Sequence, residues 1–453
     1  MQYVAVLTSS LMGSSSNMIT TWNSPVIVKL TSQNSPIGVT LSNDQASWVA
    51  SISSLGFIVG AIAAGPLLIY FGPKRMLLLA ALPIFVTWMV IAFTKFATVL
   101  IVMRCISGIG DGIIIAVLPL YIGEISDKDI RGGLTIAISI MTTLGGAFVL
   151  SVGPFVSYKA LTLSCAAVPL LFAILFIFLP DSPYFLFRKS KSEEARRTLR
   201  RLLQSTISEA IINERMREIE LTITTQRKTK SYWKDIIFRR PFRKSMFLVL
   251  GATIVMEFSG MTVLKSYLQI IIDSSDSAIS PEVSSIIFGV VQLPSIFLAA
   301  VLMDKLGRKP LYIISTIGCA IPLITAGTYF YLEKTSIHLL ANLKWLPTLC
   351  LALYIIIAPI GINVLPLVLI SEVFPTEVKS LASSTCTTFV GLLSFAFNKF
   401  FLPLSDEWGM YTIFWIFGST CIIGSLFGLF ILPETKEKSF LEIQEVLKTK
   451  TCW

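Results

Sequence analysis

Apolar runs separated by short polar segments cover almost the whole chain. Most runs are close to the ~20 residues that a helix needs to cross a bilayer. Their apolar positions are continuous and do not alternate with polar ones, which argues against the shorter strands of a membrane β-barrel. We therefore predict twelve membrane helices, at residues 1–21, 47–70, 76–93, 98–122, 134–156, 160–179, 245–272, 285–302, 311–331, 346–369, 381–401 and 411–432.

The composition agrees with a membrane protein and disfavours an enzyme. The 453 residues are 54% hydrophobic and only 14% charged, with a mean hydropathy of +0.76, whereas about a quarter of the residues of a soluble domain are charged. One histidine, His338, and seven scattered cysteines predict neither a metal site nor a disulfide framework. The chain has no Ser/His/Asp arrangement and no phosphate-binding loop, so we expect no catalytic residue and no cofactor.

The longest polar interruption is strongly basic. Between Arg188 and Lys244 it contains 17 Lys and Arg against 7 Asp and Glu, an excess equal to the net charge of +10 of the whole chain. A basic block beside membrane helices marks the cytoplasmic side, so we place both termini in the cytoplasm and expect no nucleic-acid partner. This divides the chain into six-helix halves at 1–179 and 245–432, a basic loop at 180–244 and a tail at 433–453.

The basic loop shows signs of helical structure. Ser190 and Glu193 have the spacing of a capping box. Leu199, Leu202 and Ile211 recur at helical spacing. We therefore predict short amphipathic helices within 180–244.

The stretch from Arg104 to Arg131 has a distinctive pattern of glycines. Gly108, Gly110 and Gly112 occupy every second position of an apolar run whose only charge is Asp111. Small residues let helix backbones approach closely in lipid. The pattern predicts a tightly packed membrane helix that leaves the bilayer near Glu124.

The two halves repeat each other. Glu124 precedes Arg131 by seven residues, as Glu372 precedes Lys379. Pro-Asp-Ser-Pro at 180–183 ends the first six-helix block, as Pro-Glu-Thr-Lys at 433–436 ends the second. A duplicated helical unit is typical of transporters, in which the solute site lies near the midplane between the repeats.

These landmarks resemble the sugar-porter family of the major facilitator superfamily. The fourth predicted helix has its R-x-x-x-G-x-G-x-G and P-x-Y-x-x-E elements, Asp304–Lys309 resembles D-x-x-G-R-K, and residues 433–443 resemble its tail motif. Trp22–Pro25 and Gln45–Val49 are similar to the insect facilitated trehalose transporter branch. The resemblance covers nearly the whole chain. It implies an all-α major facilitator fold of twelve transmembrane helices and facilitative sugar transport by alternating access, at the plasma membrane.

The resemblance also implies a set of gating residues. In the family, ion pairs between the two halves at the cytoplasmic face stabilise the outward-facing state. One departure affects the first half, where Ile69 and Pro73 stand at the positions of an acidic residue and an arginine. The candidate gating residues are Glu124, Arg131, Asp304, Arg308, Glu372 and Lys379.

The implied solute site departs further from the family pattern. The family has glutamines on helices five and seven, an asparagine on helix seven and a tryptophan on helix ten. Here Ala147 replaces the helix-five glutamine. Each buried polar partner lost in this way costs ~1–3 kcal/mol of binding free energy when the ligand group stays unpaired. The candidate solute-binding residues are Asn17, Met256, Glu257, Thr262, Asn363 and Leu367.

Four charged residues stand out deep within the apolar runs: Arg104, Asp111, Glu257 and Lys265. Charge at bilayer depth is costly and is usually functional or paired. Glu257 could accept hydrogen bonds from hydroxyls, bind a cation or carry a proton, and Asp111 could simply bond to a neighbouring helix. Proton-coupled relatives have a first-helix carboxylate facing the helix-four arginine. The first helix here has none, which favours uncoupled movement.

We weigh three functional hypotheses. The first is facilitative transport of a small polar solute, most simply a trehalose- or hexose-like sugar. The second is a proton-coupled carrier of a non-sugar solute, suggested by Asp111 and Glu257, and pH-dependent uptake would identify it. The third is a nutrient sensor that does not transport, suggested by the altered site and Pro73. In all three the protein is embedded in membrane lipid.

Overall fold

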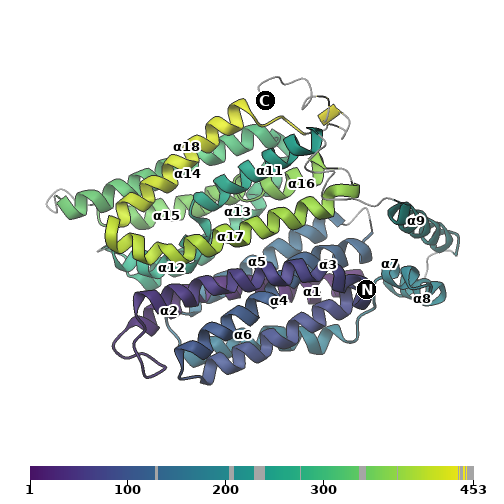
Figure 1. Cartoon of the computed structure of the whole chain (residues 1–453), viewed down its shortest axis with the longest axis horizontal. Helices are drawn as coiled ribbons and strands as arrows, with labels where there is room; N and C mark the ends of the chain where they lie inside the picture. Colours follow the sequence, from purple (N-terminus) through teal and green to yellow (C-terminus); the bar gives the residue numbers. More distant parts are fainter. Residues whose placement is uncertain are drawn as a thin grey trace. The chain divides into compact units, whose positions relative to one another are not determined.

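The computed structural model of the chain describes residues 1–127, 131–203, 209–228, 240–275, 277–335, 343–374 and 376–436, together with 438, 442, 443 and 445. The side chains of some helical residues, among them Arg131 and Asp304, are also outside this description. The described chain is almost entirely helical, and no strand occurs within these ranges (Figure 1). This confirms the predicted all-α fold class.

All twelve predicted membrane segments lie in helices. The first six occupy α1 (Gln2–Thr21), α3 (Asn43–Phe93), α4 (Ala97–Ile125), α5 (Arg131–Val152) and α6 (Tyr158–Phe176), while the short helix α2 (Asn23–Thr31) lies where no membrane segment was predicted. The second six occupy α11 (Arg240–Phe258), α12 (Met261–Asp273), α13 (Pro281–Leu306), α14 (Arg308–Thr335), α15 (Leu346–Ile357), the 3-10 helix η2 (Ala358–Ile360), α16 (Leu365–Val373), α17 (Thr376–Trp408) and α18 (Met410–Phe430).

The described helices are long and apolar enough to form a multi-pass membrane protein. By length and composition, 9 helical segments of the described chain are candidate membrane spans. One of them, Asn43–Phe93, contains two predicted segments, because Gly72 (φ 75°, ψ 165°) interrupts α3 between them. The other two predicted segments are the serine-rich α1 and the part of α5 at Ile136–Val152, which is apolar but below the length of a full span.

Two of the predicted membrane helices are broken in the middle. The segment predicted at 245–272 is interrupted between α11 and α12, where Gly260 has a φ of 87° that only glycine adopts without strain. The segment predicted at 346–369 is interrupted between α15 and α16, where Pro359 and Gly361 disfavour a continuous helix. Each of the two segments still counts as one candidate membrane span, at Phe242–Asp273 and at Leu346–Val373.

The chain forms two compact units. Residues 1–19, 52–146 and 158–230 make up the first unit, and residues 20–51, 147–157 and 231–453 make up the second. Two short segments, 20–51 and 147–157, thus group with the second unit although they lie in the first part of the sequence. Each unit is described below by itself.

In the first unit, glycines bring α3 and α4 into backbone contact. A Cβ on Gly108 would meet the carbonyl of Ser53, and one on Gly112 would meet the carbonyl of Phe57. Gly110 faces the other way, towards Ile84 in the second part of α3. The alternating glycines thus pack α4 against two helical segments at once, which confirms the predicted close packing.

Replacing Gly112 by valine should separate α3 from α4. The added side chain would meet the backbone of Phe57 and Ala61, and overpacking of this kind costs ~1–3 kcal/mol. We expect a lower thermal midpoint of the purified protein in detergent. Gly123→Val on the same helix is the matched control, because a Cβ there meets nothing within 4 Å. Equal destabilisation by both variants would contradict the packing argument.

The basic loop contains three short helices, α7 (Pro183–Arg188), α8 (Ser192–Leu202) and α9 (Glu209–Lys228), which lie together (Figure 1). Leu199 packs with Ile219 and Ile223 in a small apolar cluster. An ion pair of 2.5 Å between Arg215 and Asp127 connects α9 to the end of α4. The predicted short helices are therefore confirmed.

Two details of that prediction were wrong. Lys191, and not Ser190, precedes α8 as its N-cap, and its side chain makes no capping hydrogen bond. Ser190 instead has a φ of 62° in the turn after α7. Ile211 is exposed, because the apolar stripe of α9 runs through Ile219 and Ile223.

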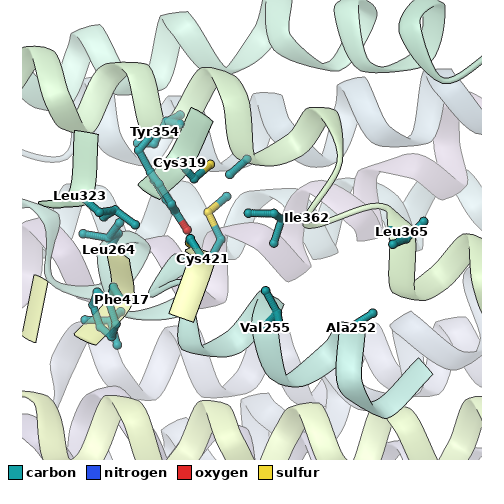
Figure 2. Packing of buried hydrophobic residues seen from close by; sticks show 14 of the residues in the cluster. Ala252, Val255, Leu264, Cys319, Leu323, Tyr354, Ile362, Leu365, Phe417 and Cys421 are labelled. Carbon is teal, nitrogen blue, oxygen red and sulfur yellow. The ribbon is translucent and has the colours of Figure 1, made fainter. Parts of the chain in front are cut away.

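In the second unit, α14 and α18 pack along each other (Figure 1). Their buried side chains join those of α11, α12 and α15 in one large apolar cluster. Figure 2 shows part of it, with Tyr354 of α15 among Cys319, Leu323, Phe417 and Cys421. This core surrounds the break between α11 and α12 and holds that break in place.

Candidate solute site and gating residues

Glu257 is the central polar residue of the second unit. It lies at the end of α11, just before the break, and only 4% of it is exposed. Its Oε2 accepts a hydrogen bond of 2.9 Å from the Ser394 hydroxyl of α17 and one of 3.0 Å from the Thr262 hydroxyl of α12. The carboxylate therefore connects three helical elements in an otherwise apolar region.

The helix break next to Glu257 is firmly held. The Ser259 hydroxyl lies 2.9 Å from the Tyr354 hydroxyl of α15 and also donates to the Met256 carbonyl. A Cβ on Gly260 would collide with the Phe417 ring. A broken helix at membrane depth exposes backbone groups and is a common way to build a transporter site.

Lys265 lies two turns after Glu257, on α12. The two side chains interact electrostatically but form no direct ion pair, since no N···O distance between them is within 4.0 Å. This agrees with the sequence spacing, which predicts one helix face but no contact.

Several polar atoms of the second unit are buried without a hydrogen-bond partner among the described residues. They are the side-chain oxygens of Asn363, before α16, of Ser266 and Gln269 on α12, and of Asn398 on α17. An unpaired buried acceptor costs ~1–3 kcal/mol, so such atoms usually bind water or ligand. Asn363 was predicted as a site residue.

Ser266, Gln269, Ser394 and Asn398 were missed by the sequence reasoning. Ser266 and Gln269 lie on α12, and Ser394 and Asn398 lie on α17, among other polar residues of the same helices. Because small polar residues are also common in membrane helices for packing alone, nothing in the sequence distinguishes these four. A helical-wheel comparison with Glu257 and Thr262 would have been the one available signal.

The other predicted site residues of this unit lie in different surroundings. Met256 is half-buried and packs against the apolar core. Leu367, at the position of the family's tryptophan, is 70% exposed on α16 and is not part of that core. Thr262 donates a hydrogen bond to the Glu257 carboxylate. The side chains of Met256 and Leu367 form no hydrogen bond with Glu257.

The first unit has its own buried polar group. Asn17 of α1 donates a 2.9 Å hydrogen bond to the Thr142 carbonyl of α5. Asp111 of α4 accepts a hydrogen bond from the Ser16 hydroxyl of α1. It also interacts electrostatically with the fully buried Arg104, which lies two turns earlier on the same face of α4. The Asp111 carboxylate is thus engaged by a neighbouring helix, although its Oδ1 keeps no hydrogen-bond partner among the described residues.

Two predicted gating residues form an ion pair within the second unit. The Arg308 guanidinium, at the start of α14, contacts Glu372 Oε1 of α16 through Nη2 at 2.9 Å and Nε at 3.1 Å. Thr435 of the tail donates a 2.5 Å hydrogen bond to the other carboxylate oxygen. The two charged side chains are only 19% and 21% exposed, so the pair is largely shielded from solvent.

Glu434 of the tail motif holds the same corner together through backbone groups. Its carboxylate accepts hydrogen bonds from the N–H groups of Arg308 and Lys309, at 3.0 and 3.1 Å, and from those of Thr435 and Lys436. Burial alone would raise the pKa of Glu434, but these four backbone donors outweigh it and lower the pKa below its usual value. The charged form of Glu434 is therefore favoured in the folded protein.

The first unit contains the counterpart of this corner without its arginine. Ser182 donates to Glu124 as Thr435 does to Glu372, and Lys74 donates to the carbonyls that follow α6 as Lys309 does to the Leu429 carbonyl. Pro73 stands where Arg308 stands in the second unit. The sequence repeat thus has a structural counterpart, and the first copy lacks the cation.

The structure shows no ion pair for the remaining gating candidates among the described residues. Lys379 Nζ donates a 3.4 Å hydrogen bond to the Ser371 carbonyl and does not pair with Glu372. The side chains of Arg131 and Asp304 lie outside the described residues. The described residues include no group of three His, Cys, Asp or Glu placed to hold a metal ion.

Replacing Glu434 by glutamine should make stability depend on pH in a defined way. Because the folded-state pKa is below the usual 4.5, the ionised carboxylate contributes stability above about pH 4.5, and this contribution is lost as the pH falls through the lowered pKa. We expect the variant to have a lower thermal midpoint than the wild type at pH 7. The difference should shrink below pH ~4.5.

Glu407→Gln, which changes an exposed carboxylate of α17, is the control and should follow the wild type. A Glu434→Gln deficit that is equally large at acidic pH would contradict the role of the charge.

The chain is similar in sequence to known transporters. A family model described as "Sugar (and other) transporter" matches residues 3–447. The facilitated trehalose transporter Tret1 of Bombyx mori is 31% identical over 90% of this chain and 80% of its own length, and that of Apis mellifera ligustica is 30% identical over 98% and 88%.

Among solved structures, the inward-open xylose transporter XylE from E. coli superposes with a TM-score of 0.80 at 22% identity, covering 98% of this chain and all of the other. At this level of identity the superposition shows a shared fold, and the fold is that of a major facilitator transporter.

Proposed function

The chain belongs to the sugar (and other) transporter family, and from this premise we propose that it moves a sugar, trehalose- or hexose-like, across a membrane by facilitated transport. The observation that carries the proposal is the polar group around Glu257 at the break between α11 and α12. It is a buried site rich in hydrogen-bond acceptors within an apolar, multi-pass protein.

The chemistry of the site fits a polyhydroxylated solute. Glu257 is an acceptor only, and the side-chain oxygens of Asn363, Gln269 and Asn398 are acceptors without partners among the described residues. A sugar offers many O–H donors, so binding would pair these acceptors and recover their desolvation cost. Replacement of the family's glutamines by Met256 and Glu257 thus changes the partners but keeps a hydrogen-bonding site.

The proposal includes the absence of proton coupling. Glu257 already accepts two hydroxyl hydrogen bonds, and Asp111 is engaged by Ser16 on the neighbouring helix. Asp111 interacts electrostatically with Arg104 from the same helix, whereas the carboxylate of proton-coupled relatives faces this arginine from the first helix. Two named relatives are facilitated trehalose transporters, which supports uncoupled movement.

We further propose roles and positions that follow from this function. The Arg308–Glu372 pair and its first-unit counterpart around Glu124 act in gating, together with Arg131, Asp304 and Lys379. Membrane halves at 1–179 and 245–432, with both termini in the cytoplasm, follow from the charge pattern. The plasma membrane is the expected location, in line with a solute taken from the surroundings.

Uptake of radiolabelled trehalose and of glucose by the purified protein in sealed liposomes tests this proposal. We expect saturable uptake of at least one sugar that a pH gradient does not change. Uptake that requires the gradient would favour a proton-coupled carrier. Protein that is folded by size-exclusion chromatography but takes up neither sugar would overturn the sugar assignment, and binding without uptake would indicate a sensor.

A further inference from the structure

A basic cavity lies in the first unit, between α3 and the helices of the basic loop. It has a volume of about 680 Å³ and is formed by the middle of α3, by α7 and by α8. Its charged lining residues are Arg75, Asp181, Lys189, Lys191, Glu194 and Arg197. We refer to it as the basic cavity. It is separate from the solute site, which lies in the second unit.

The cations of the basic cavity are only partly neutralised. Lys191 forms an ion pair of 2.9 Å with Glu194, which accounts for one cation and one carboxylate. Asp181 interacts electrostatically with Arg75 but accepts its hydrogen bond from the Ser182 backbone. Arg75 and Arg197 are both exposed and make no hydrogen bond or direct ion pair with a described residue. Like charges gathered in this way favour an anionic ligand.

One wall of the basic cavity continues into the lipid-facing surface. Tyr70 lines the cavity, is 69% exposed and ends the first membrane segment of α3. Lys74 Nζ donates hydrogen bonds of 2.9 and 2.5 Å to the carbonyls of Ile177 and Leu179, just after membrane helix α6. Phe178 in this segment is 71% exposed, and its carbonyl accepts a hydrogen bond from Arg201 of α8. Exposed aromatic side chains of this kind mark the depth of the lipid headgroups.

We propose that the basic cavity binds the phosphorylated headgroup of an anionic phospholipid, with Arg75 and Arg197 contacting the phosphate oxygens and the acyl chains lying against Tyr70 and Phe178. Arginine matches phosphate geometry through paired N–H donors. The cavity is large enough for a headgroup, and a soluble phosphate would leave the exposed Tyr70 and Phe178 rings without a partner. The predicted orientation places the basic cavity at the cytoplasmic leaflet, where anionic lipids are abundant.

Binding of a short-chain phosphatidylinositol phosphate to the full-length protein in neutral detergent tests this proposal, with phosphatidylcholine of the same chain length as the reference. We expect the wild type to bind the anionic lipid in preference to phosphatidylcholine. Arg75→Gln combined with Arg197→Gln should weaken binding by about 10- to 30-fold, as expected for two cations at a lipid headgroup. Thr198→Glu, which adds a carboxylate to the cavity lining, should weaken it while keeping both arginines.

The matched control is Arg217→Gln combined with Lys305→Gln, which removes two exposed cations elsewhere and should leave the affinity within about 3-fold of the wild type. All variants are compared only if they elute as the wild type does in size-exclusion chromatography. Equal weakening by the control pair, or wild-type affinity in both cavity variants, would overturn the proposal. Inositol phosphate binding as tightly as the lipid would show a soluble phosphate site instead. The proposal concerns the first unit alone and does not depend on which solute is carried.

Discussion

Replacing Glu257 by leucine is expected to reduce sugar uptake by about 100-fold or more, as two buried hydrogen bonds and one charge are lost together. The Ser394 and Thr262 hydroxyls would lose their common acceptor, and Lys265 would lose the nearest negative charge. The acceptor that a sugar hydroxyl would use would also be gone. The measurement is the initial rate of radiolabelled sugar uptake into liposomes, at equal amounts of reconstituted protein.

Glu257→Gln separates hydrogen bonding from charge. Glutamine keeps one acceptor oxygen for the Ser394 and Thr262 hydroxyls but carries no charge. For a facilitative sugar carrier we expect this variant to retain substantial uptake, with a raised half-saturating concentration. Loss of uptake in Glu257→Gln as complete as in Glu257→Leu would instead indicate that the negative charge itself is needed, as in a cation- or proton-coupled carrier.

Replacing Arg308 by alanine is expected to have the largest effect on stability. The Glu372 carboxylate would be left largely buried, with only the Thr435 hydroxyl as partner. Breaking a fully buried pair from one side costs ~3–5 kcal/mol, and the partial exposure of this pair reduces the cost to roughly 2–3 kcal/mol. We expect the thermal midpoint in detergent to fall by about 2–3 °C.

Two further variants make this prediction specific. Lys305→Ala removes an exposed cation just before the same loop and should change the midpoint little. The double variant Arg308→Ala with Glu372→Ala removes both charges and should be less destabilised than the sum of the single variants, because no unpaired charge remains. Strictly additive effects would contradict a direct coupling between Arg308 and Glu372.

The proline at position 73 makes the two units unequal. In the second unit the Arg308 guanidinium joins the α13–α14 loop to Glu372. In the first unit Glu124 accepts a hydrogen bond from the Ser182 hydroxyl and interacts only electrostatically with Arg188. If ion pairs of this kind bias two conformations separated by a few kcal/mol, the second unit supplies most of that bias here. This would make Arg308 and Glu372 more important than their first-half counterparts.

Much of the fold follows from the sequence because it depends on properties that are local in the chain. A run of about twenty apolar residues has few alternatives to a membrane helix, since every backbone polar group must be paired within the segment. The spacing of Gly108, Gly110 and Gly112 similarly indicated backbone contact without showing which helices meet there. The repeat of Glu124 and Glu372 pointed to two equivalent corners, and the structure has both.

The candidate site was predictable only in part. Glu257 and Lys265 were recognised because a charge in an apolar run is costly and therefore conspicuous. Ser394, Asn398 and Gln269 were not recognised, because a hydroxyl or amide in such a run has no distinct cost until its surroundings are known. The broken helices were also missed, since Gly260 and Gly361 are tolerated in continuous membrane helices and act as breaks only where neighbouring side chains, such as Phe417, occupy the space beside them.

The sequence by itself determined the class of this protein: an all-α, multi-pass membrane protein built from a repeated six-helix unit, with a basic loop and charged residues at bilayer depth. Hydropathy, charge asymmetry and motif spacing depend on residues that are close together in the chain, so they can be evaluated without knowing the fold. Only the tertiary structure decided that Thr262 and Ser394 share the Glu257 carboxylate, that Arg308 pairs with Glu372, and that Arg75 and Arg197 line one cavity. These contacts join residues far apart in the chain, and their existence depends on which helix faces meet.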